Sequence, residues 1–207
     1  DPAKFQNFGE FKAAFYKQLE WLLTQAIDLN EIFGYMYQKY LPTPLLSGLF
    51  QGPMETGKDL IFGGAKYNSS GVTHIGFADV ADSLNSIQYV LDNKMATLGE
   101  IVQAVQNNFS SKAGKEIQNK LKAAPKYGTE DSMAIQNSKE LVHFLYGAYQ
   151  ARTNYRGGKY RPAFWTMTNH AGLGKIGGAL PSGHNANTVF SSGITPSSQN
   201  TQSLTAA

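Results

Sequence analysis

The sequence predicts an α/β protein in which the helices come first and a strand with glycine-rich loops comes last. Over most of residues 1–155, apolar side chains recur at spacings of three and four, which is the period of an amphipathic helix. Residues 156–207 lack that period. There, a short aromatic and β-branched run over 163–169 predicts a strand, and segments rich in Gly, Ser and Asn predict loops.

The longest predicted helix lies near the N-terminus, from Phe8 to about Tyr40, as one helix or two in series. Pro42 and Pro44 end it, since proline lacks an amide hydrogen and biases the preceding residue away from helix. We interpret the aromatic residues of this helix as core, because such side chains are usually buried. The leucines of residues 45–49 are expected to begin a short buried segment. The helical spacing is carried by Phe11, Phe15, Leu19, Leu22, Leu23, Ala26, Ile27 and Phe33.

Further stretches predict helices over residues 78–90, 97–108, 113–123 and 129–152. The second has the clearest start, because Thr97 and Glu100 form the pattern of a capping box. The first follows a polar run that contains Gly63, Gly64 and Gly71. This run predicts a backbone that turns tightly where a side chain would not fit.

Composition limits the class of protein. The chain has 207 residues, of which 42% are hydrophobic and 16% charged, as expected of a folded globular domain. It has no cysteine, which excludes disulfides, thiolate metal sites and a cysteine nucleophile within this chain. No apolar run approaches the ~18 residues that span a bilayer, and the N-terminus lacks a signal-peptide pattern. We therefore expect a cytoplasmic protein that binds no membrane.

Charge is distributed unevenly along the chain. The net charge is +3, and Glu140 is the last acidic residue. The basic side chains that follow it favour anionic partners, and they are Arg152, Arg156, Lys159, Arg161 and Lys175. This leaves open a function of another class, a non-catalytic interaction or nucleic-acid-binding module. Because these residues are dispersed and no RNA-binding signature accompanies them, we expect no nucleic acid among the partners.

Two glycine motifs have the spacing of nucleotide sites but not the context. Residues 52–58 fit a phosphate loop, yet Asp59 stands where a Ser or Thr should bind magnesium. Residues 172–177 fit the dinucleotide motif, yet Pro181 follows where a helix should start, and no acidic residue lies downstream. The histidines also lack the spacing of a zinc site. We expect no bound cofactor and no metal.

Several short motifs follow one another along the chain. They are PLLSGL (44–49), GKD (57–59), GGAKYN (63–68), GFADVADSLNSI (76–87), ALPSG (179–183) and GITP (193–196). In this order they resemble the glycyl radical enzymes, the superfamily of pyruvate formate-lyase and its dehydratase and lyase relatives. The resemblance runs from about Phe8 to the end, so the final segment is expected to be a connecting loop and not a tail.

The resemblance implies a ten-stranded α/β barrel wrapped by helices, with a cysteine loop and a glycine loop meeting at its centre. A glycyl radical, installed by a radical S-adenosylmethionine activating enzyme, converts the cysteine into a thiyl radical that abstracts a substrate hydrogen. This sequence has neither the cysteine nor the R-V-x-G-Y motif of the radical glycine. Residues 1–207 thus resemble a partial pyruvate formate-lyase-like domain, the helix-rich segment between the two loops, with no catalytic residue in this chain.

The resemblance also implies an activity for the whole enzyme. GGAKYN and ALPSG resemble the dehydratase and lyase branch, which predicts radical elimination or cleavage of a C–O, C–N, C–S or C–C bond in a small, anionic substrate. Radical addition to fumarate and arylacetate decarboxylation are the alternatives. Ser182 and His184 stand where the family usually has Asp and Arg. We therefore do not expect the salt contacts that usually form within the ALPSG loop.

The chain alone is predicted to be inactive. The partners implied are the remainder of the polypeptide or a partner subunit, the activating enzyme and, in the complete enzyme, a second copy.

The most specific local prediction concerns the strand that carries Arg161, Ala163, Trp165 and Met167. These residues alternate, so their side chains should face one way. In the family that the chain resembles, the strand ahead of the loop that carries ALPSG lines the substrate pocket. The resemblance therefore makes Arg161, Trp165 and Met167 residues of the substrate-pocket wall. The alternative is a half-buried strand with Trp165 and Met167 in the core and Arg161 at the rim.

Overall fold

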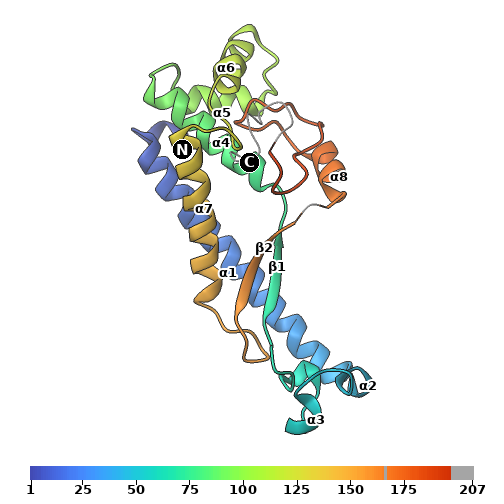
Figure 1. Cartoon of the computed structure of the whole chain (residues 1–207). Coiled ribbons are helices and arrows are strands. Elements are labelled where there is room, and N and C mark those ends of the chain that lie inside the picture. The colour runs from blue at the N-terminus through green and yellow to red at the C-terminus, as the bar shows by residue number, and fades with distance from the viewer. Residues whose placement is uncertain (166, 197–207) are drawn as a thin grey trace. The chain divides into compact units, whose positions relative to one another are not determined.

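The computed structural model of the chain describes residues 1–165 and 167–196 (Figure 1). It divides into two compact units. Unit 1 comprises residues 1–15, 73–143 and, within the described part, 164–196, and unit 2 comprises residues 16–72 and 144–163. None of the helices in the described ranges combines the length and the apolar composition that a membrane span requires. The final residues 197–207, for which a connecting loop is expected, lie outside the described residues.

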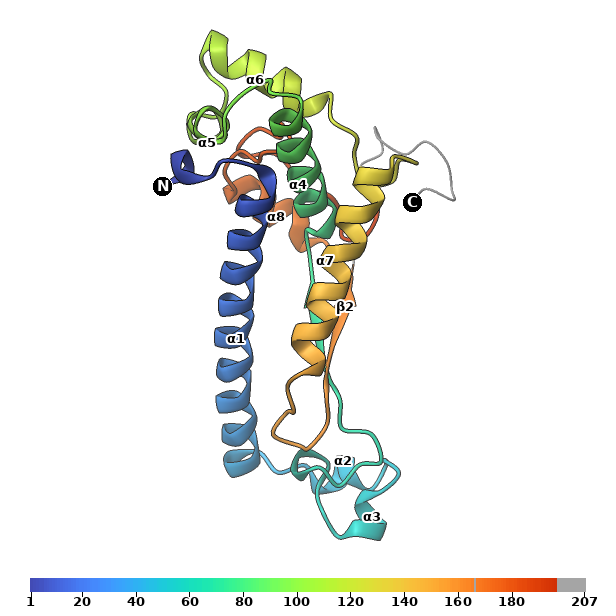
Figure 2. The ribbon, with the colours of Figure 1, turned by 90° about the vertical axis from the view of Figure 1, so that its left-hand side faces the viewer.

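Most of the predicted helices are confirmed, each within a few residues of its expected ends. Figure 2 shows α1 running without interruption, so the first stretch is one helix and not two. Along the chain the elements are η1 (Pro2–Lys4), α1 (Phe8–Tyr40), α2 (Pro44–Ser47), α3 (Pro53–Thr56), η2 (Leu60–Phe62), β1 (Ser70–His74), α4 (Phe77–Asp92), α5 (Leu98–Gln106), α6 (Lys112–Lys122), α7 (Ser132–Gln150), β2 (Tyr160–Phe164) and α8 (Asn169–Ile176).

Side-chain caps fix where the helices of unit 1 begin. The predicted capping box of α5 is confirmed, because the Thr97 N–H donates to Glu100 Oε2 at 2.7 Å and the Glu100 N–H donates to Thr97 Oγ1 at 3.3 Å. At α7, Asp131 Oδ1 accepts from the backbone N–H groups of Met133 and Ala134 at 2.9 and 3.1 Å. These bonds satisfy donors that have no partner within the helix.

The core of unit 1 lies where α4, α5 and α6 pack against one another. Val90, Ile101 and Leu121 contribute one buried side chain from each helix, and Phe109, in the turn after α5, is buried against them. A second cluster joins the start of α1 to α4 and α5, and it contains Phe8, Leu84, Ile87 and Leu98. Burial of each such side chain stabilises the fold by about 1.5–3 kcal/mol, so α4 is held on two sides.

The strand prediction is right in kind but wrong in its bounds. The strand covers Tyr160–Phe164 and not residues 163–169, and α8 forms after it in a segment for which loops were predicted. Strand β2 pairs with β1 in a small parallel sheet. The Trp165 N–H extends the pairing beyond the strand by donating to the His74 carbonyl at 3.3 Å.

Strand β1 lies within residues 1–155, which the sequence predicts to be helical apart from turns. Its residues, SGVTH, carry little apolar alternation, so local pattern gives no strand signal. The strand forms because Ser70 N–H donates to the carbonyl of Lys159, which lies far away along the chain. Parallel pairing of this kind needs a long crossover, and α4 to α7 supply it.

The GGAKYN motif forms the tight turn that the sequence predicts, and it does so within unit 2. The Asn68 side-chain amide donates to the carbonyls of Gly63 and Ala65 at 3.2 and 2.7 Å. Gly63 has φ 81°, and a Cβ there would lie 2.6 Å from the Arg156 carbonyl oxygen. At Gly64, a Cβ would lie 1.9 Å from the Lys58 carbonyl oxygen. Both glycines are therefore required by sterics, whatever their part in chemistry.

Two predictions of burial are wrong for this chain. Leu45 and Leu49, expected in a buried segment, are 92% and 82% exposed. In α1, Trp21 and Phe33, interpreted as core, are 58% and 55% exposed. The reason is that α2 has only four residues and buries only Ser47, and the described residues do not cover these apolar side chains. The apolar pattern gives helical periodicity correctly but does not say which segment covers each face.

Candidate functional site

The three predicted pocket residues do not share one strand. Arg161 lies in β2, whereas Trp165 and Met167 follow its end at Phe164. Within β2, the period-two argument holds for Arg161 and Ala163. Trp165 and Met167 belong to unit 1, where they are 60% and 37% exposed, and so neither is a core residue of the described structure.

Arg161 belongs to unit 2 and lines a hollow there of about 380 Å³. Three cationic side chains, those of Lys66, Lys159 and Arg161, border it, and no acidic residue is among its lining residues. The rest of the lining consists of Tyr67, Asn68, Ser69, Gly157 and Gly158. Such a hollow suits an anionic group, since the guanidinium can make paired, charge-assisted hydrogen bonds to a carboxylate or sulfonate.

Asn154 joins the two chain segments that line this hollow. Its side-chain oxygen accepts from the N–H of Gly158 at 2.9 Å, and its amide donates to the Asn68 carbonyl at 2.7 Å. A Cβ at Gly158 would lie 2.0 Å from that same carbonyl oxygen, so only glycine allows the two chain segments to approach this closely. Asn154 is 4% exposed, so a buried side chain fixes the backbone of both segments, whereas Lys66, Lys159 and Arg161 are exposed.

A second, polar hollow of about 610 Å³ lies in unit 1, between the start of α4 and the loops that carry ALPSG and GITP. Two carboxylates of α4 organise it. Asp82 accepts the Tyr127 N–H at 2.6 Å, and Asp79 accepts the N–H and the hydroxyl of Ser191 at 2.9 and 3.2 Å. One turn of α4 thus holds both the loop before α7 and the C-terminal loop.

Lys126 connects the same helix to the ALPSG loop. Its ammonium donates to the carbonyls of Leu121 and Ser182 at 2.8 and 3.1 Å and to the hydroxyl of Ser86. Burial lowers the pKa of Lys126 to about 8, against the opposing attraction of Asp82. Burial likewise raises the pKa of Asp82 to about 6, although the Tyr127 N–H and Lys126 favour the charged form.

The ALPSG turn is fixed from a second side. The Gln118 amide donates to the Gly183 carbonyl at 2.9 Å, and Gly183 has φ 91°. A Cβ on Gly183 would lie 2.7 Å from the Lys122 side chain. Sequence reasoning identifies the turn but misses Gln118 and Lys126, because a polar residue on a helix gives no signal that it faces a distant loop.

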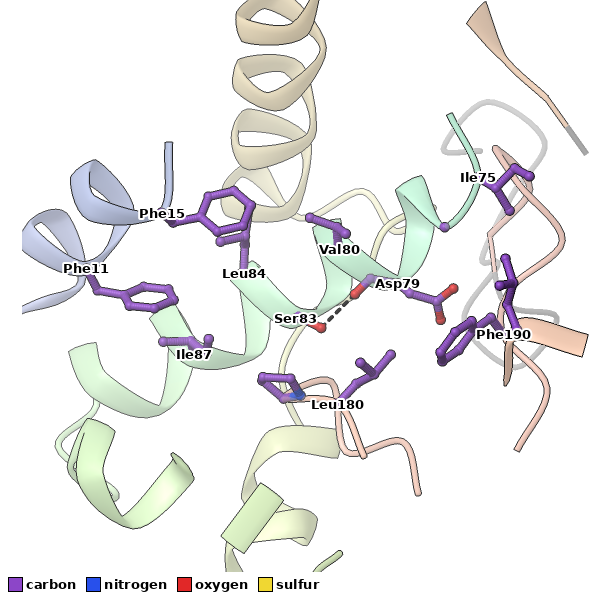
Figure 3. Close-up of a pocket in the computed structure, with 13 residues that line it drawn as sticks. Phe11, Phe15, Ile75, Asp79, Val80, Ser83, Leu84, Ile87, Leu180 and Phe190 are labelled. Carbon is purple, nitrogen blue, oxygen red and sulfur yellow. Dashed lines mark hydrogen bonds between the residues drawn. The ribbon is translucent and has the colours of Figure 1, made fainter. Parts of the chain in front are cut away.

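An apolar hollow of about 490 Å³ lies on the other side of the Asp79 turn, still within unit 1 (Figure 3). Phe15 of α1, Leu84 of α4 and Leu180 of the ALPSG loop line it, together with Phe190. Figure 3 shows the Asp79 carboxylate directed toward Phe190, and both residues line the polar hollow as well. Burial raises the pKa of Asp79, against the hydrogen bonds from Ser191.

Among the described residues, the side chains around the two hollows of unit 1 do not form a metal site. Among residues 1–165 and 167–196, no group of three His, Cys, Asp or Glu side chains is placed to hold a metal ion. The ALPSG loop, which contains Ser182, is held by Gln118 and Lys126.

The fold of this chain is similar to that of solved glycyl radical enzymes. A glycyl radical enzyme from Archaeoglobus fulgidus matches with a TM-score of 0.89 at 30% identity, over 96% of this chain and 26% of that chain. The chain belongs to the pyruvate formate lyase-like family, whose model matches residues 1–174. The resemblance read from the motifs is confirmed.

Two curated relatives are dehydratases. Trans-4-hydroxy-L-proline dehydratase from Clostridioides difficile is 33% identical over 95% of this chain and 25% of its own length. (2S)-3-sulfopropanediol dehydratase from Klebsiella oxytoca is 31% identical over 82% of this chain and 21% of its own length. The chain thus spans about a quarter of the length of the relatives that it matches.

The buried carboxylate of Asp82 predicts a specific pH dependence. Its pKa rises from 3.8 to about 6 on folding, so between about pH 4 and pH 6 the folded chain keeps a proton that the unfolded chain has released. The stability from neutral Asp82 is therefore lost as pH rises through this window. Asp82→Asn cannot ionise, and relative to the natural residue it should gain about 3 kcal/mol of stability over the window.

The measurement is the difference in melting temperature between the two forms of the polypeptide that contains this chain, taken at steps from pH 4 to pH 7. It should change up to about pH 6 and then level off. Asp92→Asn, at the exposed end of the same helix, separates the effect of net charge from that of burial. A difference for Asp82→Asn that stays constant with pH would show that this carboxyl group is not buried in the complete protein.

Proposed function

We propose that this chain is part of a glycyl radical enzyme of the dehydratase and lyase branch, which cleaves a C–O, C–N, C–S or C–C bond in a small anionic substrate. The observation that carries the proposal is the 33% identity to trans-4-hydroxy-L-proline dehydratase over 95% of the chain. Both dehydratases named above act on substrates with an anionic group, a carboxylate in one and a sulfonate in the other. These relatives favour elimination over fumarate addition or arylacetate decarboxylation.

We infer that the residues that carry out the radical chemistry lie outside this chain. The sequence has no cysteine to form a thiyl radical and no radical glycine motif. The glycyl radical would be stored elsewhere in the enzyme and installed by a radical S-adenosylmethionine activating enzyme. The complete enzyme is proposed to be a cytoplasmic homodimer.

This chain's own part is to hold loops and to bind substrate. Asp79 and Lys126 anchor the loops that carry GITP and ALPSG. Arg161 is proposed to meet the anionic group of the substrate within unit 2. Trp165 and Met167 are proposed as residues of the substrate-pocket wall on the strength of the resemblance alone. The exposed state of Trp165 and Met167 in this chain is consistent with a pocket whose other walls come from the rest of the enzyme.

Electron paramagnetic resonance after treatment with the activating enzyme tests whether the residues of the radical chemistry lie outside this chain. The chain alone should give no glycyl radical doublet and no turnover, because it lacks the residues that store the radical and abstract hydrogen. The complete polypeptide should give the doublet. A doublet from residues 1–207 alone, or its absence from the complete activated enzyme, would contradict the proposal.

Arg161→Ala in the complete enzyme tests the anion-binding role. A charge-assisted hydrogen bond to a carboxylate or sulfonate is worth about 1.5–3 kcal/mol, so kcat/KM for the anionic substrate should fall roughly ten- to a hundredfold. Arg152→Ala is the matched control, because Arg152 is an exposed arginine of the same unit that does not line the hollow. Trp165→Ala should instead broaden the range of substrates accepted.

If Arg161 lies at a solvated rim, its loss costs less than about 1 kcal/mol. A specificity constant unchanged by Arg161→Ala, measured with trans-4-hydroxy-L-proline or sulfopropanediol, whichever is turned over, would rule out the pocket role.

A further inference from the structure

The side chains at the start of β2 alternate between the interior of unit 2 and the hollow that Arg161 lines. Tyr160 is 0% exposed, whereas its neighbours Lys159 and Arg161 are exposed and line the hollow. Successive residues of a strand point to opposite faces, so the direction of the Tyr160 side chain determines the direction of its two neighbours. A shift of the strand by one residue would turn Arg161 away from the hollow.

The Tyr160 hydroxyl is held by two consecutive residues of α1. It accepts a hydrogen bond from the Asn30 amide at 2.8 Å and donates one to Glu31 Oε1. Burial, together with the Glu31 carboxylate, raises the pKa of Tyr160 to about 12, so at neutral pH the hydroxyl keeps its proton and remains a donor. A hydroxyl that donates to one partner and accepts from another is fixed in direction as well as in position.

The backbone around Tyr160 is fixed by two other elements. The Tyr160 carbonyl accepts a hydrogen bond from the Gln150 amide at 3.1 Å, and the Lys159 carbonyl accepts one from the Ser70 N–H at 3.0 Å. Gln150 is the last residue of α7, and Ser70 is the first residue of β1. These partners belong to unit 2, as do the two residues of α1. The start of β2 is therefore held from three elements of one compact unit.

Arg161 depends on this arrangement for its place in the hollow. Its guanidinium makes no hydrogen bond or ion pair with the residues that the structure describes, so no described side chain directs it. Its backbone follows directly from Tyr160. We propose that Tyr160 is a positioning residue for substrate binding, which holds β2 in the orientation that directs Arg161 at the anionic group of the substrate. The inference rests on the proposed role of Arg161 and extends it to Tyr160 and its two partners on α1.

The test is a double-mutant cycle of Tyr160→Phe and Arg161→Ala in the complete, activated enzyme. Tyr160→Phe keeps the buried ring and removes the hydroxyl. It should raise KM for trans-4-hydroxy-L-proline or sulfopropanediol, whichever is turned over, by about three- to tenfold, with kcat changed by less than roughly twofold. In the Arg161→Ala background it should have no further effect on kcat/KM, because the residue through which it acts is gone.

Three further variants separate the hydrogen bond from loss of packing. Glu31→Gln keeps an oxygen that accepts from the Tyr160 hydroxyl, so KM should stay near that of the natural enzyme. Glu31→Ala removes the acceptor and should raise KM as Tyr160→Phe does. Tyr37→Phe is the matched control, because Tyr37 is an exposed tyrosine of the same helix that does not line the hollow, and it should leave KM unchanged.

The cycle distinguishes failure of the inference from failure of the proposed function. Equal effects of Tyr160→Phe in both backgrounds would show that Tyr160 only stabilises the fold and would overturn the inference. An unchanged KM for Tyr160→Phe, where Arg161→Ala lowers kcat/KM, would overturn it and leave the role of Arg161 intact. An unchanged kcat/KM for Arg161→Ala would contradict the anion-binding role, and the inference with it.

Hydrogen–deuterium exchange of the complete polypeptide before activation adds a readout that needs no turnover. Tyr160→Phe should speed exchange in the peptide that contains residues 160–164, and Tyr37→Phe should not. Equal exchange in the natural and Tyr160→Phe proteins would show that the hydroxyl does not hold β2, and would overturn the inference whichever substrate the enzyme takes.

Discussion

Two carboxylates, Asp79 and Asp82, are buried in the first turns of α4, and a buried carboxylate is costly unless it accepts hydrogen bonds. Each finds its donors on a different loop. Asp82 accepts from Tyr127, ahead of α7, and Asp79 accepts from Ser191, after the ALPSG turn. Because the carboxylates need those donors, the position of α4 determines the position of both loops. Lys126 strengthens the link by binding the ALPSG backbone at Ser182.

Much of the fold could be predicted from local sequence, because its helices are amphipathic and carry their own start signals. Thr97 with Glu100 is an example, since the capping bonds form between residues three positions apart. The failures share a physical cause, which is dependence on a distant segment. Strand β1 exists only through its pairing with β2, and Leu45, which was expected to be buried, is 92% exposed because no described segment covers it.

The candidate site was accessible to sequence reasoning only through the order of the motifs. GGAKYN and ALPSG indicate the family, yet the structure gives glycines of both motifs a steric reason, as at Gly63 and Gly183. No role was predicted for Lys126, because nothing in the sequence shows that it is buried. Arg161, Trp165 and Met167 were predicted to lie on one strand, but β2 ends at Phe164. Their common role therefore remains a proposal.

The central claim is that Asp79 anchors the C-terminal loop through Ser191, independently of the Asp82 anchor at Tyr127. Hydrogen–deuterium exchange of the complete polypeptide, natural and Asp79→Ala, tests it most directly. The account predicts that exchange becomes faster in the peptide containing Ser191 and is unchanged at Tyr127. Equal protection at Ser191 in both proteins, or loss of protection at both residues together, would contradict it.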